Sequence, residues 1–269
     1  MHLLFSEEGN ARLAEVAQPG LLCAFDFDGT LAPIVLKPEH ARLPDEIRRH
    51  LIALLAYAPI AIITGRSIED IHSRLGFEPD FVIGNHGLEG VPGWEAQARR
   101  HQALCVEWRA QLAAALEQYD PAIQLEDKRY SLAVHYRHAS DGRDAEIRLQ
   151  RLFALLDPMP RIVSGKYVFN LLPQDSGNKG NALEQLMAMS GARHAIYVGD
   201  DVTDEDVFRL ERDHVLSIRI EHASDSAAEF FVPRPEDIVR LLTDLVGRLR
   251  LEDAVNWMQT ALLKTENFE

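Results

Sequence analysis

The chain has 269 residues, 46% of them hydrophobic and 26% charged, which are the proportions of an ordinary globular protein. Its formal net charge of −14 argues against nucleic acid or an anionic membrane as a partner, because both need a basic surface. The N-terminal region has early acidic residues and no extended apolar run, so we expect neither a signal peptide nor a membrane span. The two cysteines, Cys23 and Cys105, show no disulfide or zinc spacing, which favours a reducing, cytoplasmic setting.

The first third of the chain alternates short apolar runs with segments of helical period. Continuous apolar runs predict buried strands at 21–27, 60–66 and 81–87. Helices are expected between them, at 43–58 and 67–76. Buried strands separated by helices indicate a parallel sheet that is covered on both faces.

The pattern changes over residues 97–173. Two helices are expected there, at about 97–118 and at 143–156. Two segments contain half-exposed strands in which polar and apolar residues alternate, at 123–137 and 161–173. Ser164 and Gly165 look like the two-residue turn of a hairpin. The order α-β-β-α-β-β predicts a small antiparallel sheet with helices on one face, which is a separate α+β unit.

The α/β alternation resumes after this unit. The expected elements are a helix at 178–187, a strand at 194–201, a helix at 204–211, a strand at 214–220 and a last helix from about 234. We therefore predict a doubly wound, mostly parallel α/β core formed by residues 1–96 and 174–269, with an inserted α+β cap formed by residues 97–173.

Polar residues follow the predicted core strands at the point where each strand ends. They are Asp26, Asp28, Thr64, Arg66, Asn85, His86, Asp200, Asp201 and Asp204. Ligands of open parallel sheets bind at this edge. The five acidic groups would repel one another strongly there without a cation, and hard oxygen ligands suit Mg²⁺. The pattern therefore predicts a magnesium site.

A magnesium site beside a free carboxylate, a hydroxyl and a lysine is suited to phosphoryl transfer. One aspartate can attack phosphorus and form an aspartyl-phosphate, while a second one can protonate the leaving alcohol and later activate water. Thr64 and the N–H groups of the Asp-Gly-Thr turn would hold phosphate oxygens. Lys179, near a predicted helix N-terminus, adds positive charge where the helix dipole already favours an anion.

Each of these features also has a purely structural interpretation. An isolated Asp-x-Asp pair more often forms a turn or caps a helix, and the acidic residues at 200–206 could complement a helix dipole. Glu126 and Lys128 could be a surface ion pair, and His86 could be a hydrogen-bonded structural histidine. Structural or packing roles are expected for His135, Trp94 and Trp108.

Four motifs, in order, are similar to those of the haloacid-dehalogenase-like phosphatases. They are DFDGTL at 26–31, a threonine after the second strand, a lysine before a helix, and GDDVTDEDVF at 199–208. The resemblance implies a Rossmann-like core with Asp26 as the nucleophile and Asp28 as the general acid and base. It also implies phosphate contacts from Thr64 and Lys179. The implied Mg²⁺ site consists of Asp26, Asp28 (through its backbone carbonyl), Asp200, Asp201 and Asp204.

Nearly the whole chain resembles the trehalose-6-phosphate phosphatases. The matching segments include ITGR at 63–66, GNHGLE at 84–89, LEDKRYSLAVHYR at 125–137 and SGKYVFNLLP at 164–173. The resemblance implies hydrolysis of trehalose 6-phosphate to trehalose and phosphate, a step of trehalose biosynthesis, under a cap that closes and opens. The implied sugar contacts are Arg66, Asn85, His86, Gly87, Glu126, Lys128, Lys166 and Asn170. The expected partner is this small sugar phosphate, and we expect a monomer or weak dimer.

Two positions depart from that family. Asn170 stands where a glutamate is usual, and Gln174 stands where a basic residue is common. The first departure leaves open a phosphatase for another glycosyl phosphate, such as sucrose 6-phosphate or glucosylglycerol phosphate. A non-catalytic sugar-phosphate sensor is a further alternative, but a protein that only binds has no need of both Asp26 and Asp28.

Overall fold

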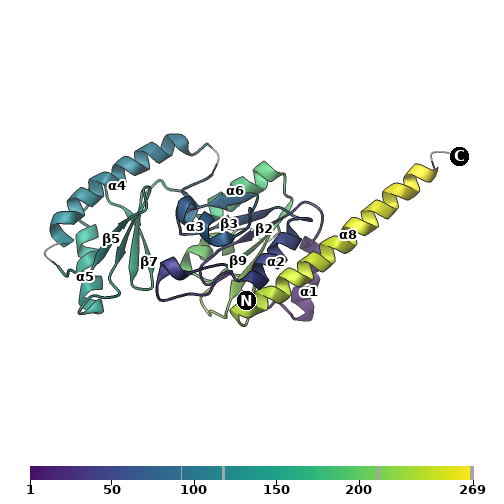
Figure 1. Ribbon diagram of the computed structural model, residues 1–269, viewed down its shortest axis with the longest axis horizontal. Helices are drawn as coiled ribbons and strands as arrows, with labels where there is room; N and C mark the ends of the chain where they lie inside the picture. The colour runs from purple at the N-terminus through teal and green to yellow at the C-terminus, as the bar shows by residue number, and fades with distance from the viewer. Residues whose placement is uncertain (92, 117–118, 211–212, 267–269) are drawn as a thin grey trace.

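The computed structural model describes residues 1–91, 93–116, 119–210 and 213–266, which form a core and a cap lying side by side (Figure 1). The core is built on a seven-stranded sheet in the order β1-β11-β10-β9-β2-β3-β4, in which every strand pair is parallel. Its strands are β1 (His2–Leu3), β2 (Leu21–Phe25), β3 (Ile60–Ile63), β4 (Phe81–Ile83), β9 (His194–Gly199), β10 (Val215–Ile220) and β11 (Phe230–Val232). The predicted parallel α/β core is confirmed.

Helices cover both faces of this sheet. They are α1 (Glu7–Val16), α2 (Asp45–Leu54), α3 (Ile68–Leu75), α6 (Lys179–Ser190), α7 (Glu205–Phe208) and α8 (Ile238–Glu266). Cys23 and Phe25 of β2 pack with α1, α2 and α8, whereas Leu22 and Ala24 pack with α6 and α7. Both faces of β2 are buried, which explains its unbroken apolar sequence.

Capping residues fix the ends of the helices that flank the carboxyl edge of the sheet. The hydroxyl of Ser67 accepts a hydrogen bond from the backbone N–H of Asp70, and Gly76 ends α3 in a left-handed conformation with φ of 65°, as predicted. Asn178 caps α6 in the same way, so Lys179 is the first residue of that helix. This places its side chain at the carboxyl edge of β2.

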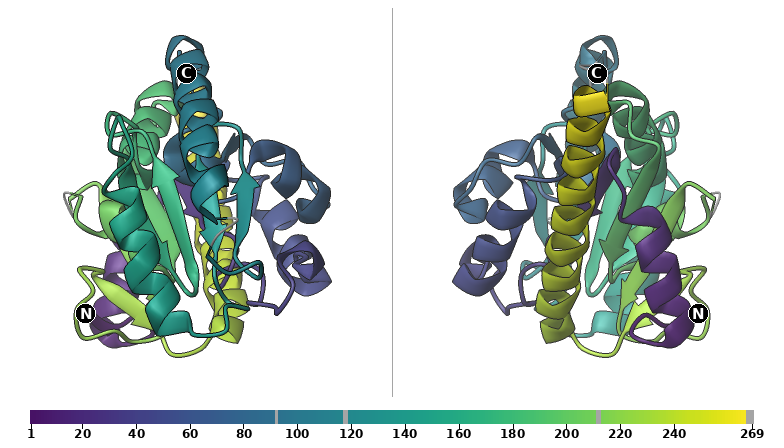
Figure 2. Two further views of the ribbon diagram at one scale, coloured as in Figure 1. Left: turned by 90° about the vertical axis from the view of Figure 1, so that its left-hand side faces the viewer. Right: turned by 90° about the vertical axis from the view of Figure 1, so that its right-hand side faces the viewer.

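The last helix, α8, packs on the core through its first turns and then extends beyond it, on the side opposite the cap (Figures 1 and 2). Among the described residues, no helix is both long enough and apolar enough to cross a lipid bilayer.

The cap is an antiparallel sheet with two helices on one face. Its strands are β5 (Gln124–Asp127), β6 (Leu132–His135), β7 (Arg161–Gly165) and β8 (Val168–Leu172), in the order β5-β6-β8-β7. Its helices are α4 (Glu95–Leu116) and α5 (Gly142–Phe153). Leu132, Val134 and Phe169 of the sheet pack against Trp108 and Phe153 of these helices, so the predicted α+β arrangement is confirmed.

Hydrogen bonds join the open face of the cap sheet to the core. The hydroxyl of Ser131 donates to Oδ1 of Asn85 at 3.1 Å, and Nη1 of Arg137 donates to the carbonyl of Leu36 at 3.2 Å. Nζ of Lys128 donates to the carbonyl of Gly65 at 3.4 Å. The open face of the cap sheet is therefore turned toward the carboxyl edge of the core sheet.

Two local predictions are wrong. The third core strand ends at Ile83 and not at residue 87, because Asn85 and His86 adopt positive φ values of 49° and 59° in the short 3₁₀ turn η2 (Asn85–Gly87). The cap hairpin turns at Lys166 and Tyr167 and not at Ser164 and Gly165, because Ser164 pairs with Phe169 and Gly165 pairs with Val168. This register keeps Phe169 on the face that packs against the cap helices.

The segment 123–137 contains the two strands that the predicted order α-β-β-α-β-β requires, with a turn between them at Arg129, whose φ is 71°. Two short strands of the core sheet differ from the prediction. The strands β1 and β11 were not predicted, because two or three residues are too few to show a period.

Candidate active site

The loop after β2 brings Asp26 and Asp28 to the carboxyl edge of the sheet. Asp26 is 4% exposed, and its backbone N–H donates to the carbonyl of Val198 on β9 at 2.9 Å. The chain then turns at Gly29, whose φ of +87° is a left-handed conformation. A Cβ at this position would lie 2.1 Å from Oδ2 of Asp200, so only glycine allows the two loops to approach so closely.

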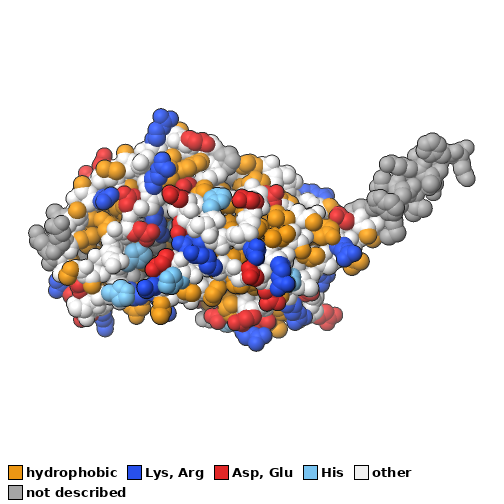
Figure 3. Space-filling model, viewed as in Figure 1, with side chains coloured by type: hydrophobic (Ala, Val, Ile, Leu, Met, Phe, Trp, Pro, Cys, Tyr) orange, Lys and Arg blue, Asp and Glu red, His pale blue; other side chains and the backbone are white. Residues whose placement is uncertain are grey.

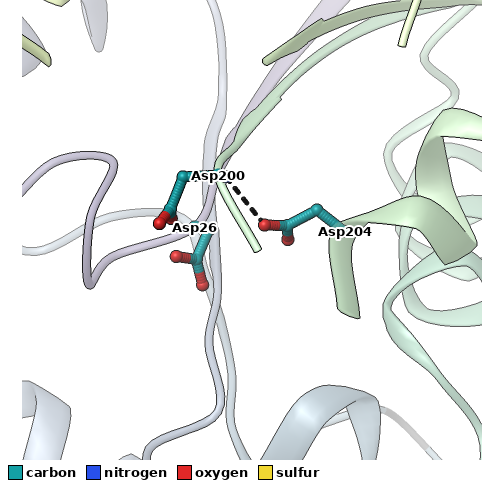
Figure 4. Close-up of side chains that lie close together, drawn as sticks. All are labelled: Asp26, Asp200 and Asp204. Atoms are coloured by element: carbon teal, nitrogen blue, oxygen red, sulfur yellow. Dashed lines mark hydrogen bonds between the residues drawn. The ribbon is translucent and has the colours of Figure 1, made fainter. Parts of the chain in front are cut away.

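Three carboxylates from these two loops form an acidic cluster (Figure 4). Asp26 after β2, and Asp200 and Asp204 after β9, have oxygens within 4.8 Å of one another. In the part of the chain that the structure describes, Asp28 and Asp201 line the adjacent cleft without joining the cluster. The structure thus brings three of the predicted metal-site carboxylates together.

Asp204 is completely buried, and both of its carboxylate oxygens are engaged. Its Oδ1 accepts from Nζ of Lys179 at 2.7 Å and from the hydroxyl of Tyr197 at 2.6 Å. Its Oδ2 accepts from the backbone N–H groups of Asp200 at 2.9 Å and Asp201 at 2.8 Å, the first of which is dashed in Figure 4. Asp204 therefore holds the loop after β9 and the buried lysine in place.

Lys179 is the cation of the cluster. Its Nζ also donates to Oδ1 of Asp26 at 2.7 Å. Burial opposes the lysine charge, but the attraction of Asp204 and Asp26 outweighs it and raises the pKa of Lys179. Since a single lysine faces three carboxylates, burial and then the neighbouring acids raise the pKa of Asp26 well above its usual value. The same causes raise the pKa of Asp200 to about 7.

The acidic cluster fits a hard divalent cation. Among the described residues, no side chain donates a hydrogen bond to Oδ2 of Asp26 or to Oδ2 of Asp200. Oδ2 of Asp200 can therefore ligate a hard cation, which would neutralise the repulsion between the two carboxylates, while Oδ2 of Asp26 stays available for chemistry.

Asp28 is held by Arg66, which follows β3. Nε and Nη2 of Arg66 donate to the two oxygens of Asp28, each at 2.6 Å. Nη1 donates to Asp70 at 2.6 Å, and Nε of Arg74 donates to Asp70 at 2.8 Å. Burial opposes ionisation of Asp70, but the two arginines prevail and lower its pKa. Arg66 is therefore shared between two carboxylates, and its paired hydrogen bonds fix the orientation of Asp28.

The cap forms the opposite wall of a cleft of about 340 Å³ above the acidic cluster. Its strands direct alternate side chains into the cap's own hydrophobic core and into this cleft. The cap residues that line the cleft are Glu126, Lys128, His135, Arg137, Gly165, Lys166, Val168 and Asn170. Charged and histidine side chains gather between cap and core in Figure 3. Nζ of Lys128 lies 3.4 Å from Oδ1 of Asn170, so these two predicted sugar contacts adjoin.

Four predicted site residues lie behind the cleft surface, namely Thr64, Asn85, Gly87 and Asp204. The hydroxyl of Thr64 accepts from the backbone N–H of Arg66 at 3.2 Å, which leaves its own proton for another acceptor. Asn85 accepts from Ser131 of the cap and donates to Glu89, so it supports the junction of cap and core.

His86 lines the cleft beside the two lysines. Burial, followed by the charges of Lys128 and Lys179, lowers the pKa of His86 well below its usual value, so the ring is neutral. Its buried Nδ1 has no hydrogen-bond partner among the described residues. The ring lies against Gly65, where a Cβ would be 2.4 Å from Cε1. The backbone of the GNHG segment thus presents an uncharged imidazole to the cleft.

Sequence reasoning missed three polar residues of the site. Thr30 donates to Oδ1 of Asp200 at 3.0 Å, Tyr197 donates to Asp204, and His135 contacts Glu126 at 2.8 Å. A tyrosine within a buried strand was a usable signal, because a buried hydroxyl needs a partner. His135 occupies a polar position in a strand whose polar and apolar residues alternate, and this pattern could also have assigned it to the cleft.

The fold and the acidic cluster together match the haloacid-dehalogenase-like class: a parallel sheet with an inserted cap, and a cluster built on the Asp-x-Asp loop, a buried lysine and a second acidic loop. The sequence model of the trehalose-phosphatase family matches residues 24–236, and the chain belongs to this family.

Curated relatives agree with this assignment. A trehalose-phosphate phosphatase of Mycobacterium tuberculosis is 32% identical over 241 residues, which cover 84% of this chain and 61% of the relative. One of Mycobacterium avium is 34% identical over 197 residues, which cover 70% of this chain and 50% of the relative. The chain therefore spans about half to three fifths of the length of these relatives.

Solved structures share the fold. The C-terminal domain of the trehalose-6-phosphate phosphatase of C. albicans has a TM-score of 0.66 and 21% identity, and the match covers 88% of this chain and 95% of that one. A sucrose-phosphatase of Synechocystis sp., solved with sucrose and phosphate, has a TM-score of 0.55 and 18% identity, and the match covers 85% and 98% of the two chains.

Proposed function

We propose that this protein hydrolyses trehalose 6-phosphate to trehalose and phosphate by a Mg²⁺-dependent mechanism with an aspartyl-phosphate intermediate. The observation that carries the proposal is the position of Asp26, which lies beside Lys179 and Asp200 at the foot of a cleft whose opposite wall is polar. Membership of the trehalose-phosphatase family supports the substrate.

Asp26 is the proposed nucleophile. Its Oδ1 is fixed by Lys179, which directs the other oxygen, Oδ2, toward an incoming phosphorus. When bound by Asp26, Asp200 and the backbone carbonyl of Asp28, Mg²⁺ would neutralise charge on the phosphoryl oxygens. Attack by Oδ2 forms the O–P bond of the acyl phosphate and breaks the bond between phosphorus and the sugar oxygen.

Asp28 is the proposed general acid and base. It gives a proton to the leaving sugar oxygen and then takes one from the water that attacks the acyl phosphate, which releases phosphate and restores Asp26. Both oxygens of Asp28 accept from Arg66, so Arg66 must shift before one of them can face the leaving sugar oxygen. Asp70 offers Arg66 a second partner during that shift.

The remaining predicted residues are assigned by their positions. Thr64 offers a hydroxyl proton to a phosphate oxygen, while Asp204 and Asp201 support the loop that carries Asp200. We assign residues 1–96 and 174–269 to the catalytic core and residues 97–173 to a cap that recognises the sugar. The proposed sugar contacts on the cleft are Arg66, His86, Glu126, Lys128, Lys166 and Asn170.

Two further assignments complete the proposal. Asn85 and Gly87 lie behind the cleft, so we assign them to shaping the loop that presents His86. Both cysteines are free and buried, which accords with a reducing cytoplasmic setting.

A panel of sugar phosphates tests the proposal. Phosphate release is measured with trehalose 6-phosphate, sucrose 6-phosphate and glucosylglycerol phosphate, with Mg²⁺ and after chelation. We expect the highest kcat/KM for trehalose 6-phosphate, loss of turnover on chelation, and no turnover by Asp26→Asn. A higher kcat/KM for another glycosyl phosphate would favour the alternative that Asn170 suggests, whereas turnover by Asp26→Asn would remove the nucleophile assignment.

A further inference from the structure

We infer that His135 is a positioning residue for sugar recognition, because it holds Glu126 in one orientation at the cap wall of the cleft. The inference rests on the proposed function, which takes Glu126 as a sugar contact. It assigns a role to a residue for which only a structural role was expected from the sequence.

The register of the cap sheet places the two side chains on one face. Gln124 of β5 pairs with His135 of β6, and Glu126 pairs with Ala133. His135 and Glu126 are therefore diagonal neighbours, a separation that long side chains can span. The residue directly opposite Glu126 is only an alanine, so Glu126 has room to lean along the strand toward His135.

The contact itself is short and directional. Nε2 of His135 lies 2.8 Å from Oε2 of Glu126. Hydrogen bonding to His135 is the main cause that lowers the pKa of Glu126, so the carboxylate is ionised and Nε2 carries the donated proton. Both side chains line the cleft and remain partly exposed, with His135 at 35% and Glu126 at 51%.

Holding one oxygen of Glu126 leaves the other available. Among the described residues, none donates a hydrogen bond to Oε1 of Glu126, although the side chain borders the cleft. A sugar hydroxyl needs an acceptor in a fixed direction, and a glutamate that is already ordered accepts it without losing further rotamer freedom. His135 thus prepares Glu126 for a hydroxyl of the sugar.

A role in cap stability is the competing explanation, and the packing argues against it. The hydrophobic core of the cap is formed by residues such as Leu132 and Val134, which point to the other face of β6. His135 lies outside that cluster and contacts the charged Glu126 at the partly exposed wall of the cleft. Its replacement should therefore leave the cap folded.

Three variants separate positioning from packing. His135→Phe keeps a ring but loses the donor, His135→Gln restores a donor at a similar reach, and His138→Phe changes an exposed histidine of the same cap as the matched control. Steady-state kinetics are measured with trehalose 6-phosphate and with p-nitrophenyl phosphate, which has no sugar. Melting temperatures confirm that each variant folds.

We expect His135→Phe to raise KM for trehalose 6-phosphate about tenfold, the effect of one hydrogen bond to a charged group, with kcat unchanged. His135→Gln and His138→Phe should resemble the wild type, and p-nitrophenyl phosphate should be hydrolysed equally by all. In a Glu126→Ala background, His135→Phe should have no further effect.

Other results overturn the inference. An unchanged KM in His135→Phe, a parallel loss with p-nitrophenyl phosphate, or a full effect of His135→Phe in the Glu126→Ala background would each contradict positioning through Glu126. If the wild type hydrolyses p-nitrophenyl phosphate but not trehalose 6-phosphate, the proposed substrate fails, and the same comparison is made with the best glycosyl phosphate of the panel.

Discussion

The balance of charge around Asp26 leads to a prediction about stability as well as activity. Asp26→Asn should abolish turnover and yet make the metal-free protein more stable at pH 7. The amide keeps an oxygen that can accept from Lys179, and it turns an NH₂ group toward the side on which Asp200 lies. Lys179 keeps its second partner, Asp204, so the substitution leaves no buried cation unpaired.

The magnitude follows from the distances. At an effective dielectric constant of about 20, a carboxylate within 4.8 Å repels Asp26 by about 3.5 kcal/mol or more, and both Asp200 and Asp204 lie within that distance. The attraction of Lys179 at 2.7 Å, about 6 kcal/mol on the same scale, roughly offsets the two repulsions. The cost of removing the buried Asp26 carboxylate from water is then uncompensated. Replacing this carboxylate with an amide should therefore raise the free energy of unfolding by roughly 1–3 kcal/mol.

Thermal unfolding in chelated buffer is the assay, and each kcal/mol should move Tm by about 2–4 °C in a protein of this size. Adding Mg²⁺ should make the Tm of the wild type higher than that of Asp26→Asn. A Mg²⁺ concentration of about 100 times Kd stabilises the wild type by about 2.7 kcal/mol and should stabilise Asp26→Asn much less. A lower Tm for Asp26→Asn in chelated buffer would refute the argument, because it would mean that the attraction of Lys179 exceeds the repulsion and the desolvation combined.

Three other substitutions test separate parts of the site. Tyr197→Phe removes a buried donor to Asp204, so the free energy of unfolding by denaturant should fall by about 1–3 kcal/mol, and an unchanged value would contradict the role given to this hydroxyl. Arg66→Lys cannot form the bidentate contact with Asp28, so kcat should fall about tenfold or more in steady-state assays, and wild-type kcat would contradict that orienting role. Because the folded-state pKa of His86 is lowered, its contribution to stability should be lost as the pH falls below about 6.5, by up to about 1.36 kcal/mol for each pH unit, while the raised pKa values of Asp26 and Asp200 act in the opposite direction. In denaturant titrations from pH 7 to 5, His86→Asn, which tolerates positive φ, should therefore gain stability relative to the wild type as the pH falls, and a constant difference would place the acid sensitivity elsewhere.

The core and its acidic loops could be predicted because their signals are local. The apolar run of β2 requires burial on both faces, and the two acids after it, taken with the three motifs that follow in order, indicate a metal and phosphate site. Caps at Ser67 and Gly76 mark the limits of α3 in the same direct way. Local preference and tertiary packing agree at all of these positions.

The remaining features depend on partners that are distant in the sequence. The turn at Lys166 and Tyr167 follows from the packing of Phe169 under the cap helices, and Ser164-Gly165 is equally suited to a turn when that packing is unknown. The different roles of the acidic residues also depend on tertiary contacts. Oδ1 of Asp204 accepts from Lys179, which α6 brings to it, and from Tyr197, whereas no side chain in the described part of the chain donates to Oδ2 of Asp200.

Asn85 and His86 show a further limit of local signals. Their positive φ values are disfavoured for most residues, and they persist because Glu89, Ser131 and the loop before α6 surround the segment. A sequence that continues an apolar strand up to residue 83 gives no indication of such a turn. Burial, and then the charges of two lysines that come from the cap and from α6, lower the pKa of His86.

The hydrogen bonds between Ser131 and Asn85, between Arg137 and Leu36, and between Lys128 and Gly65 have a thermodynamic consequence for catalysis. The bond from the Ser131 hydroxyl adds about 0.5–1.5 kcal/mol, and the two bonds from charged donors add about 1.5–3 kcal/mol each. A disaccharide that touches both walls of the cleft, as proposed, would add contacts of its own between core and cap. Its apparent affinity would then include the work of bringing the two together, so Ser131→Ala, which removes one of the bonds, should weaken binding by lowering the population that is ready to bind.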